Sequence, residues 1–147
     1  MKNRNNHTKF SWLFLLLLVV VSYNCTSQNK TMNTTTIKYV GLNIMTPINV
    51  SCENFEKAFG KQVIIMNITN QKDIDYLLNS IKKLSLDNNI KSADIRIKIE
   101  IIHDKTIDII CLGRFHIVHN GSFYKMNPEL MMFLKRKIEK NKDIYSH

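Results

Sequence analysis

The clearest pattern in the chain is a strict alternation of apolar and polar residues from Asp94 to Ile101. Such alternation predicts a strand with one buried face and one wet face. Thr106 to Leu112 predicts the next strand, and His103-Asp104-Lys105 predicts a three-residue turn between them. That turn pairs Ile101 with Ile107, Ile99 with Ile109 and Ile97 with Cys111. We therefore expect these apolar side chains to share one inner face.

Three segments have apolar residues at helical spacing. The first is capped by Ser51 and places Cys52, Phe55 and Phe59 on one face. The second is capped by Asn70, and its apolar stripe comprises Ile74, Leu77, Leu78, Ile81 and Leu84. The third has Asn127 as its cap, Pro128 at its first position, and an inner face of Leu130, Phe133, Leu134 and Ile138.

The remaining strand signals complete the order of the elements. Residues 37–44 and 63–68 predict two strands, and residues 115–124 predict a hairpin around Asn120-Gly121, a pair that favours a type I′ turn. The predicted order is β-α-β-α-β-β-β-β-α. This order is typical of the α+β class, with an antiparallel sheet and helices packed on one face.

The first 24 residues have the features of a signal peptide. Lys2, Arg4 and Lys9 precede an uninterrupted apolar run, residues 12–21. A ten-residue helix is about 15 Å long, which is half the hydrocarbon thickness of a bilayer and too short to span it. A basic start and a short apolar run are typical of secretory signal peptides. Export would exclude a cytosolic function.

Cys25 follows the apolar run and precedes Thr26, Ser27 and Gln28. This arrangement resembles the processing site of small bacterial lipoproteins of the flavobacterial type, and the resemblance implies that Cys25 becomes the lipidated first residue. The alternative is ordinary signal-peptide cleavage with Gln28 as the new N-terminus. The segments 50–55 and 110–113 resemble bacterial envelope proteins that have no assigned activity.

These features predict four parts of the chain. They are a signal peptide (1–24), a lipidated Cys25 with a flexible polar tether (25–35), one domain (36–142) and a short tail (143–147). We expect an exported protein that is anchored in a membrane and faces the periplasm. A soluble periplasmic or secreted protein is the alternative.

The net charge of the chain limits the kinds of molecule that we expect it to bind. The 147 residues contain 21 Lys and Arg against 12 Asp and Glu, a net charge of +9. Without Lys2, Arg4 and Lys9 the net charge is about +6, because three positive charges leave with the signal peptide. In an exported protein such an excess points to anionic lipid or glycan rather than to nucleic acid. Lys135, Arg136, Lys137 and Lys140 on the last helix are the candidate contacts, and a merely solvated helix face is the alternative.

Cys52 and Cys111 are the two cysteines left after Cys25. Both are predicted to point into the interface between helix and sheet, and a disulfide between them is permitted in an oxidising compartment. Two buried free thiols are the alternative.

No catalytic constellation is predicted. His116 and His119 are three residues apart, a spacing that places them on opposite faces of a strand, and His103 lies at another turn. The chain contains no HExxH, GxSxG, CxxC or Gly-rich phosphate loop. We therefore expect no catalytic residue, no metal and no cofactor.

Three hypotheses on function follow. The first is an exported lipoprotein whose domain is a non-catalytic binding or structural module of the cell envelope. The second is an inhibitor or immunity-type protein that binds an envelope protein. The third, a hydrolase that uses Cys111 or a histidine, has the least support from the sequence.

Overall fold

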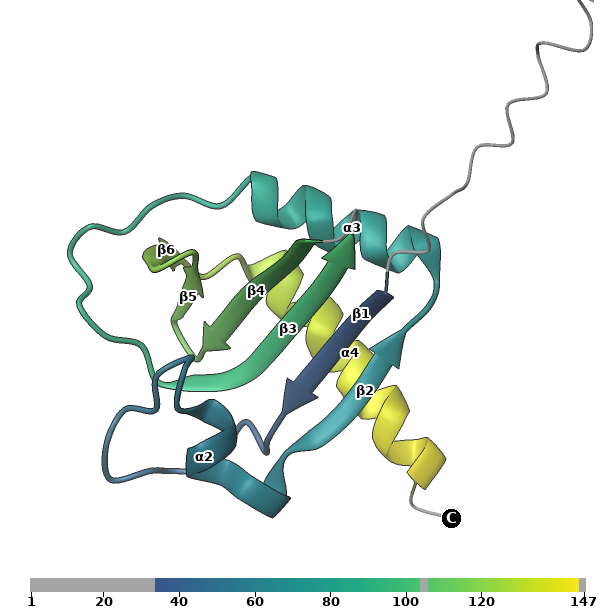
Figure 1. Ribbon diagram of the computed structural model, residues 1–147, viewed down its shortest axis with the longest axis horizontal. Coiled ribbons are helices and arrows are strands. Elements are labelled where there is room, and N and C mark those ends of the chain that lie inside the picture. Colours follow the sequence, from purple (N-terminus) through teal and green to yellow (C-terminus); the bar gives the residue numbers. More distant parts are fainter. Residues whose placement is uncertain (1–33, 104–105, 146–147) are drawn as a thin grey trace, which may run out of the picture. The chain divides into compact units, whose positions relative to one another are not determined.

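The computed structural model describes residues 34–103 and 106–145 and has the predicted α+β architecture (Figure 1). Six strands form one antiparallel sheet in the order β2-β1-β3-β4-β5-β6. The elements in chain order are β1 (Thr34–Tyr39), α2 (Phe55–Phe59), the 3-10 helix η1 (Gly60–Gln62), β2 (Ile64–Ile68), α3 (Gln71–Lys82), β3 (Ile95–His103), β4 (Thr106–Gly113), β5 (His116–His119), β6 (Ser122–Lys125) and α4 (Pro128–Tyr145).

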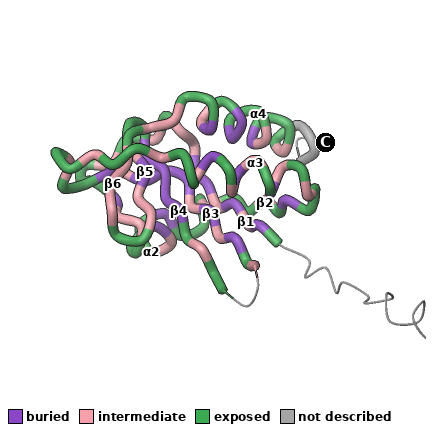
Figure 2. The backbone as a smooth tube through the Cα atoms, turned by 90° about the horizontal axis from the view of Figure 1, so that it is seen from above, coloured by how far each residue is buried: buried purple, intermediate pink, exposed green. Residues whose placement is uncertain are grey.

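The two longer helices, α3 and α4, cover one face of the sheet, as predicted (Figure 2). Both begin at the predicted caps: the Asn70 side chain accepts a hydrogen bond from the Lys72 amide, and the Asn127 side chain accepts from the amides of Glu129 and Leu130. The core between helices and sheet is hydrocarbon, and it includes Ile37, Ile97, Ile99, Ile110, Leu112, Ile74, Leu77, Leu134 and Ile138.

The short helix α2 packs on the opposite face, which differs from the expectation that all helices share one face (Figure 2). Phe55 and Phe59 are buried there with Val40, Ile95 and Cys111. The helix begins at Phe55 rather than near Ser51, and its first turn follows Asn54. Because α2 has only five residues, it covers one end of this face and leaves the other end open (Figure 1).

The predicted pairing of β3 with β4 is wrong by one residue. Ile101 lies opposite Asp108, and Ile102 lies opposite Ile107. β3 continues through His103, which was predicted to lie in the turn, and residues 104–105 of that predicted turn lie outside the described residues. This register turns Ile110 and Leu112 toward α3 and α4, whereas Ile107, Ile109 and Cys111 point to the face of α2.

The hairpin between β5 and β6 turns at Asn120 and Gly121, as predicted. Both residues have a positive φ, 50° and 74°, as a type I′ turn requires. The ends of the domain differ slightly from the predicted boundaries. β1 already begins at Thr34, which lies in the predicted tether, and α4 continues to Tyr145, beyond the predicted domain end.

A bulge in β3 between Ile95 and Ile97 buries Arg96, which the alternating pattern had placed on the wet face. Its guanidinium donates to both carboxylate oxygens of Asp94, to the carbonyls of Ile44 and Ile95 and to the Thr46 hydroxyl. Arg96 therefore ties the loop 41–50 to the sheet. Opposite the bulge, a Cβ on Gly113 would lie 2.6 Å from the Asp94 carbonyl oxygen, so only glycine fits there.

Candidate functional site

Cys52 and Cys111 form a disulfide that fastens the start of the α2 segment to β4. Their Cα atoms are 5.7 Å apart and 59 residues apart in sequence. The bond lies beside Phe55 and Phe59, on the α2 face. The sequence thus identified the right pair, although the interface that holds it is not the one that α3 and α4 form.

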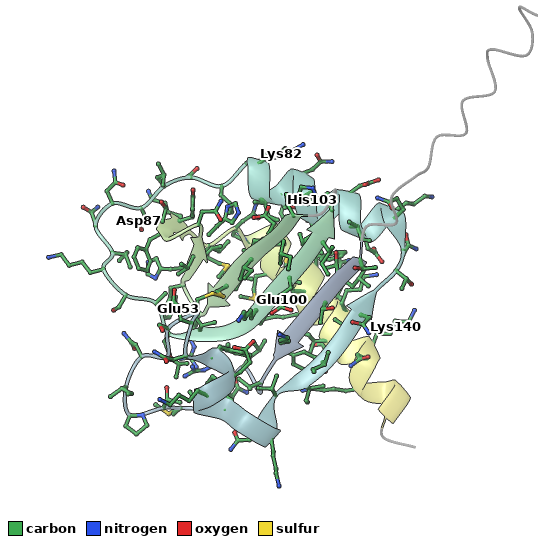
Figure 3. The ribbon with its side chains drawn as sticks, in the orientation of Figure 1. Glu53, Lys82, Asp87, Glu100, His103 and Lys140 are labelled. Atoms are coloured by element: carbon green, nitrogen blue, oxygen red, sulfur yellow. A yellow bond between two sulfur atoms is a disulfide. The ribbon has the colours of Figure 1, made fainter. Side chains whose placement is uncertain are left out.

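Four charged side chains form a connected network next to α2. The Lys38 ammonium lies 2.6 Å from Glu100 and 3.2 Å from Glu56, and the Lys98 ammonium donates to both oxygens of Glu56 at 2.9 and 3.1 Å. These residues come from β1, β3 and α2, so the network links the helix to two central strands. Figure 3 shows Glu100 on β3 in the middle of the sheet.

The network raises the pKa of the Lys38 ammonium and lowers the pKa of the Glu56 carboxyl. The hydrogen bond from Lys38 to Glu100, against the effect of burial, raises the pKa of Lys38 above its ordinary value. Partial burial acts to raise the pKa of Glu56, but the hydrogen bonds that it accepts from Lys98, the backbone and Lys38 outweigh it and leave that pKa lowered. Both groups are therefore charged at neutral pH and neutralise each other.

Beyond this network the sheet face is apolar and uncovered. Ile102, Ile107 and Ile109, which we call the open patch, are 45%, 63% and 39% exposed. Ile102 lies opposite Ile107 across the β3–β4 pair, and Ile109 lies opposite Glu100. Aliphatic side chains grouped on a sheet face, beside charges that are already paired, are typical of a surface that binds another protein.

The open patch was missed in the sequence, although a signal for it is present. Ile101-Ile102 and Ile109-Ile110 are adjacent isoleucines in predicted strands. Neighbouring residues of a strand point to opposite faces, so one isoleucine of each pair had to lie on the face that was expected to be wet.

The four predicted contacts for an anionic surface are not equivalent. Lys135, Arg136 and Lys140 are exposed on α4. Lys137 is half-buried and forms an ion pair with Asp73 of α3, and its ammonium lies 5.4 Å from the centre of the Phe133 ring. Lys137 therefore joins two helices, and three of the four cations face solvent.

The histidines lie in separate surroundings. His119 Nε2 is 2.6 Å from Asp108 Oδ1, on the side of α3 and α4, whereas His116 Nε2 is 3.7 Å from Asp87 Oδ2. Asp108 of β4 is therefore paired across the strands with a histidine of β5. Among residues 34–103 and 106–145, no three His, Cys, Asp or Glu side chains gather as metal ligands would.

The predicted signal peptide and Cys25 lie outside the described residues, as does most of the predicted tether. Within the described residues, no helix combines the length and the apolar character that crossing a bilayer needs.

Comparison with known proteins finds no relative of this chain. No protein-family model matches the chain, and neither a curated protein nor a solved structure matches it significantly.

Proposed function

We propose that the chain is an exported, lipid-anchored and non-catalytic binding module of the bacterial cell envelope, and that the open patch contacts a protein partner. The observation that carries the proposal is the exposure of Ile102, Ile107 and Ile109 on a sheet face whose other end is covered. Large apolar side chains that remain grouped in water favour association with another apolar surface.

Two further features support the proposal. The disulfide between Cys52 and Cys111 belongs to an oxidising compartment, in agreement with the predicted export. The charges beside the open patch are paired within the chain, so a partner can cover them without leaving an unpaired ion. An inhibitor or immunity-type protein would use the same surface, and the identity of the partner separates the two roles.

Site-specific photo-cross-linking in cells that export the full chain tests this function. A photoreactive residue replaces Ile107, and the matched control replaces Met132, which is 61% exposed on α4. We expect one discrete adduct from position 107 and none from position 132. Absence of an adduct at position 107, or the same adducts from both positions, would contradict a binding role for the open patch.

The mass of the mature N-terminus tests the anchor. A lipid-anchored chain begins with a diacylated or triacylated Cys25, whereas simple cleavage gives an unmodified end such as Gln28. Recovery of intact chain that retains Met1 from the cell interior would contradict export altogether.

A further inference from the structure

The two edges of the sheet are protected to different degrees. At the β6 edge, the segment 85–87 continues the hydrogen bonding: the Asp87 amide donates to the Phe123 carbonyl and the Lys125 amide donates to the Ser85 carbonyl, both at 2.9 Å. Figure 3 shows Asp87 beside this edge. Two outward backbone groups of β6, the Phe123 carbonyl and the Lys125 amide, are therefore satisfied within the domain.

The β2 edge has no such cover. β2 pairs with β1 on one side, and no hydrogen bond from the rest of the described chain reaches its outer side. In an antiparallel strand, alternate residues direct their N–H and C=O groups away from the paired neighbour. Within residues 34–103 and 106–145, the outward groups of β2 therefore have no backbone partner and can pair with a further strand.

The sequence of β2 also lacks the features that normally keep an edge from pairing. Residues 63–68 contain no charged residue, no proline and no glycine. Ile64 and Ile65 are 41% and 56% exposed. An uncharged, β-branched edge of this kind favours the addition of an extended segment.

Cations border this edge on the side of α4. The C-terminal turns of α4 extend past β2 (Figure 1). A cleft of about 210 Å³ between β2, α3 and α4 is lined by Met66, Ile68, Asp73, Lys137, Lys140 and Asn141. Asp73 neutralises Lys137, whereas Lys140 is exposed and forms no ion pair with any carboxylate of the described residues. A strand added to β2 would therefore meet an unneutralised positive charge on this side.

The same helix argues against a second copy of the chain as the occupant. Two copies joined through β2 would each extend α4 across the shared edge, and the two helices would compete for the same space (Figure 1). A single extended segment has no such helix. It can lie under the end of α4 and pair with β2 along its length.

We propose that β2 binds an extended segment of a partner protein by strand addition, with aliphatic side chains on the side of Ile65 and acidic side chains on the side of Lys140. This inference rests on the proposed function, because it specifies how the partner is held. Backbone hydrogen bonds would supply affinity, and Lys140 would supply selection for acidic segments.

The test uses the full chain in detergent micelles and the synthetic peptide Thr-Asp-Val-Asp-Val-Asp-Val-Thr, whose acidic and aliphatic residues alternate. Hydrogen exchange of the β2 amides is followed during titration. We expect the outward amides of Ile64–Ile68 to exchange more slowly when the peptide binds, because they gain carbonyl partners. A matched peptide with lysine in place of each aspartate should bind more weakly.

Three substitutions locate the contact. Ile65→Lys places a charge at the edge and should weaken peptide binding about tenfold or more. Met132→Lys places the same charge at an exposed position of α4 that lies outside both β2 and the open patch, and it should leave peptide affinity unchanged. Lys140→Glu should reverse the preference between the two peptides. Unfolding midpoints of the variants establish that each chain is folded.

Three other results would contradict strand addition at β2. Peptide binding without slower exchange in β2, or binding that Ile65→Lys weakens no more than Met132→Lys does, would show that the peptide does not pair with β2. Protection of β2 that grows with protein concentration alone would identify a second copy as the occupant. If no peptide binds, strand addition is wrong, while cross-linking from position 107 still decides the proposed function.

Discussion

The two faces of the sheet are closed by different means. Two long helices bury one face, and the contact between them and the strands is mainly apolar, with one hydrogen bond from Asn141 of α4 to the Tyr39 hydroxyl of β1. The other face is covered only at one end, by a five-residue helix. A helix of that length has little stability of its own. Here a disulfide and a network of ion pairs hold it, so the smaller contact depends on specific bonds rather than on buried area.

Removal of the disulfide should have the largest effect on the weaker face. In the chain-entropy model, a loop of this length stabilises the fold by about 4 kcal/mol. The double variant Cys52→Ala, Cys111→Ala should lose about that much free energy of unfolding, measured by urea titration. Reduction of the wild-type chain is the control and should give a similar loss, whereas the variant should not respond to reductant. A loss below about 1 kcal/mol in both experiments would show that α2 is held by other contacts.

A matched pair of substitutions compares the two faces directly. Ile99 lies in the core under α3 and α4, whereas Ile107 is exposed on the other side. Ile99→Ala should cost about 3 kcal/mol through lost burial and the cavity left behind, and Ile107→Ala should change stability by no more than about 0.5 kcal/mol. Urea unfolding midpoints measure both. Equal losses would mean that the open patch is buried in solution, which would contradict its role as a binding surface.

The smallest effect is expected from the ion pairs beside α2. Glu56 is partly exposed, so Glu56→Gln should cost no more than about 1 kcal/mol at neutral pH. Because the folded-state pKa of Glu56 lies below its ordinary value of 4.5, its contribution is present above that value and lost as pH falls through the folded pKa. Lys38, whose pKa is raised, contributes below its ordinary value of 10.5 and loses that contribution as pH rises past the folded pKa.

Unfolding measured from acidic to alkaline pH checks this prediction. The wild-type chain should lose part of its unfolding free energy at each extreme of pH. In Glu56→Gln, the loss at acidic pH should be smaller. If the variant loses as much unfolding free energy at acidic pH as the wild-type chain does, Glu56 does not stabilise the fold.

Much of the fold could be predicted because periodicity and caps are local signals. Asn70 and Asn127 cap the helices that the sequence indicated, and Asn120-Gly121 turns the predicted hairpin. The cysteine count identified the disulfide, because the predicted lipidation of Cys25 left Cys52 and Cys111 as the pair. The order of all strands and helices followed from these features.

The register of β3 and β4 could not be fixed in the same way, because β4 carries apolar residues on both faces. Ile107, Ile109 and Cys111 alternate as well as Ile110 and Leu112 do. The sequence alone does not say which set is buried by the long helices, and the observed register buries the second set. The candidate site was missed for this reason, since Ile107 and Ile109 were assigned to the core.

Arg96 has a consequence for the irregular segment that it binds. All of its donor groups are engaged, and they join the backbone of Ile44 and the hydroxyl of Thr46 to Asp94 on the sheet. Met45 and Ile48, between and beyond these anchors, are 89% and 76% exposed. Substitution of Met45 or Ile48 should therefore leave the hydrogen bonds that attach this loop to the sheet in place.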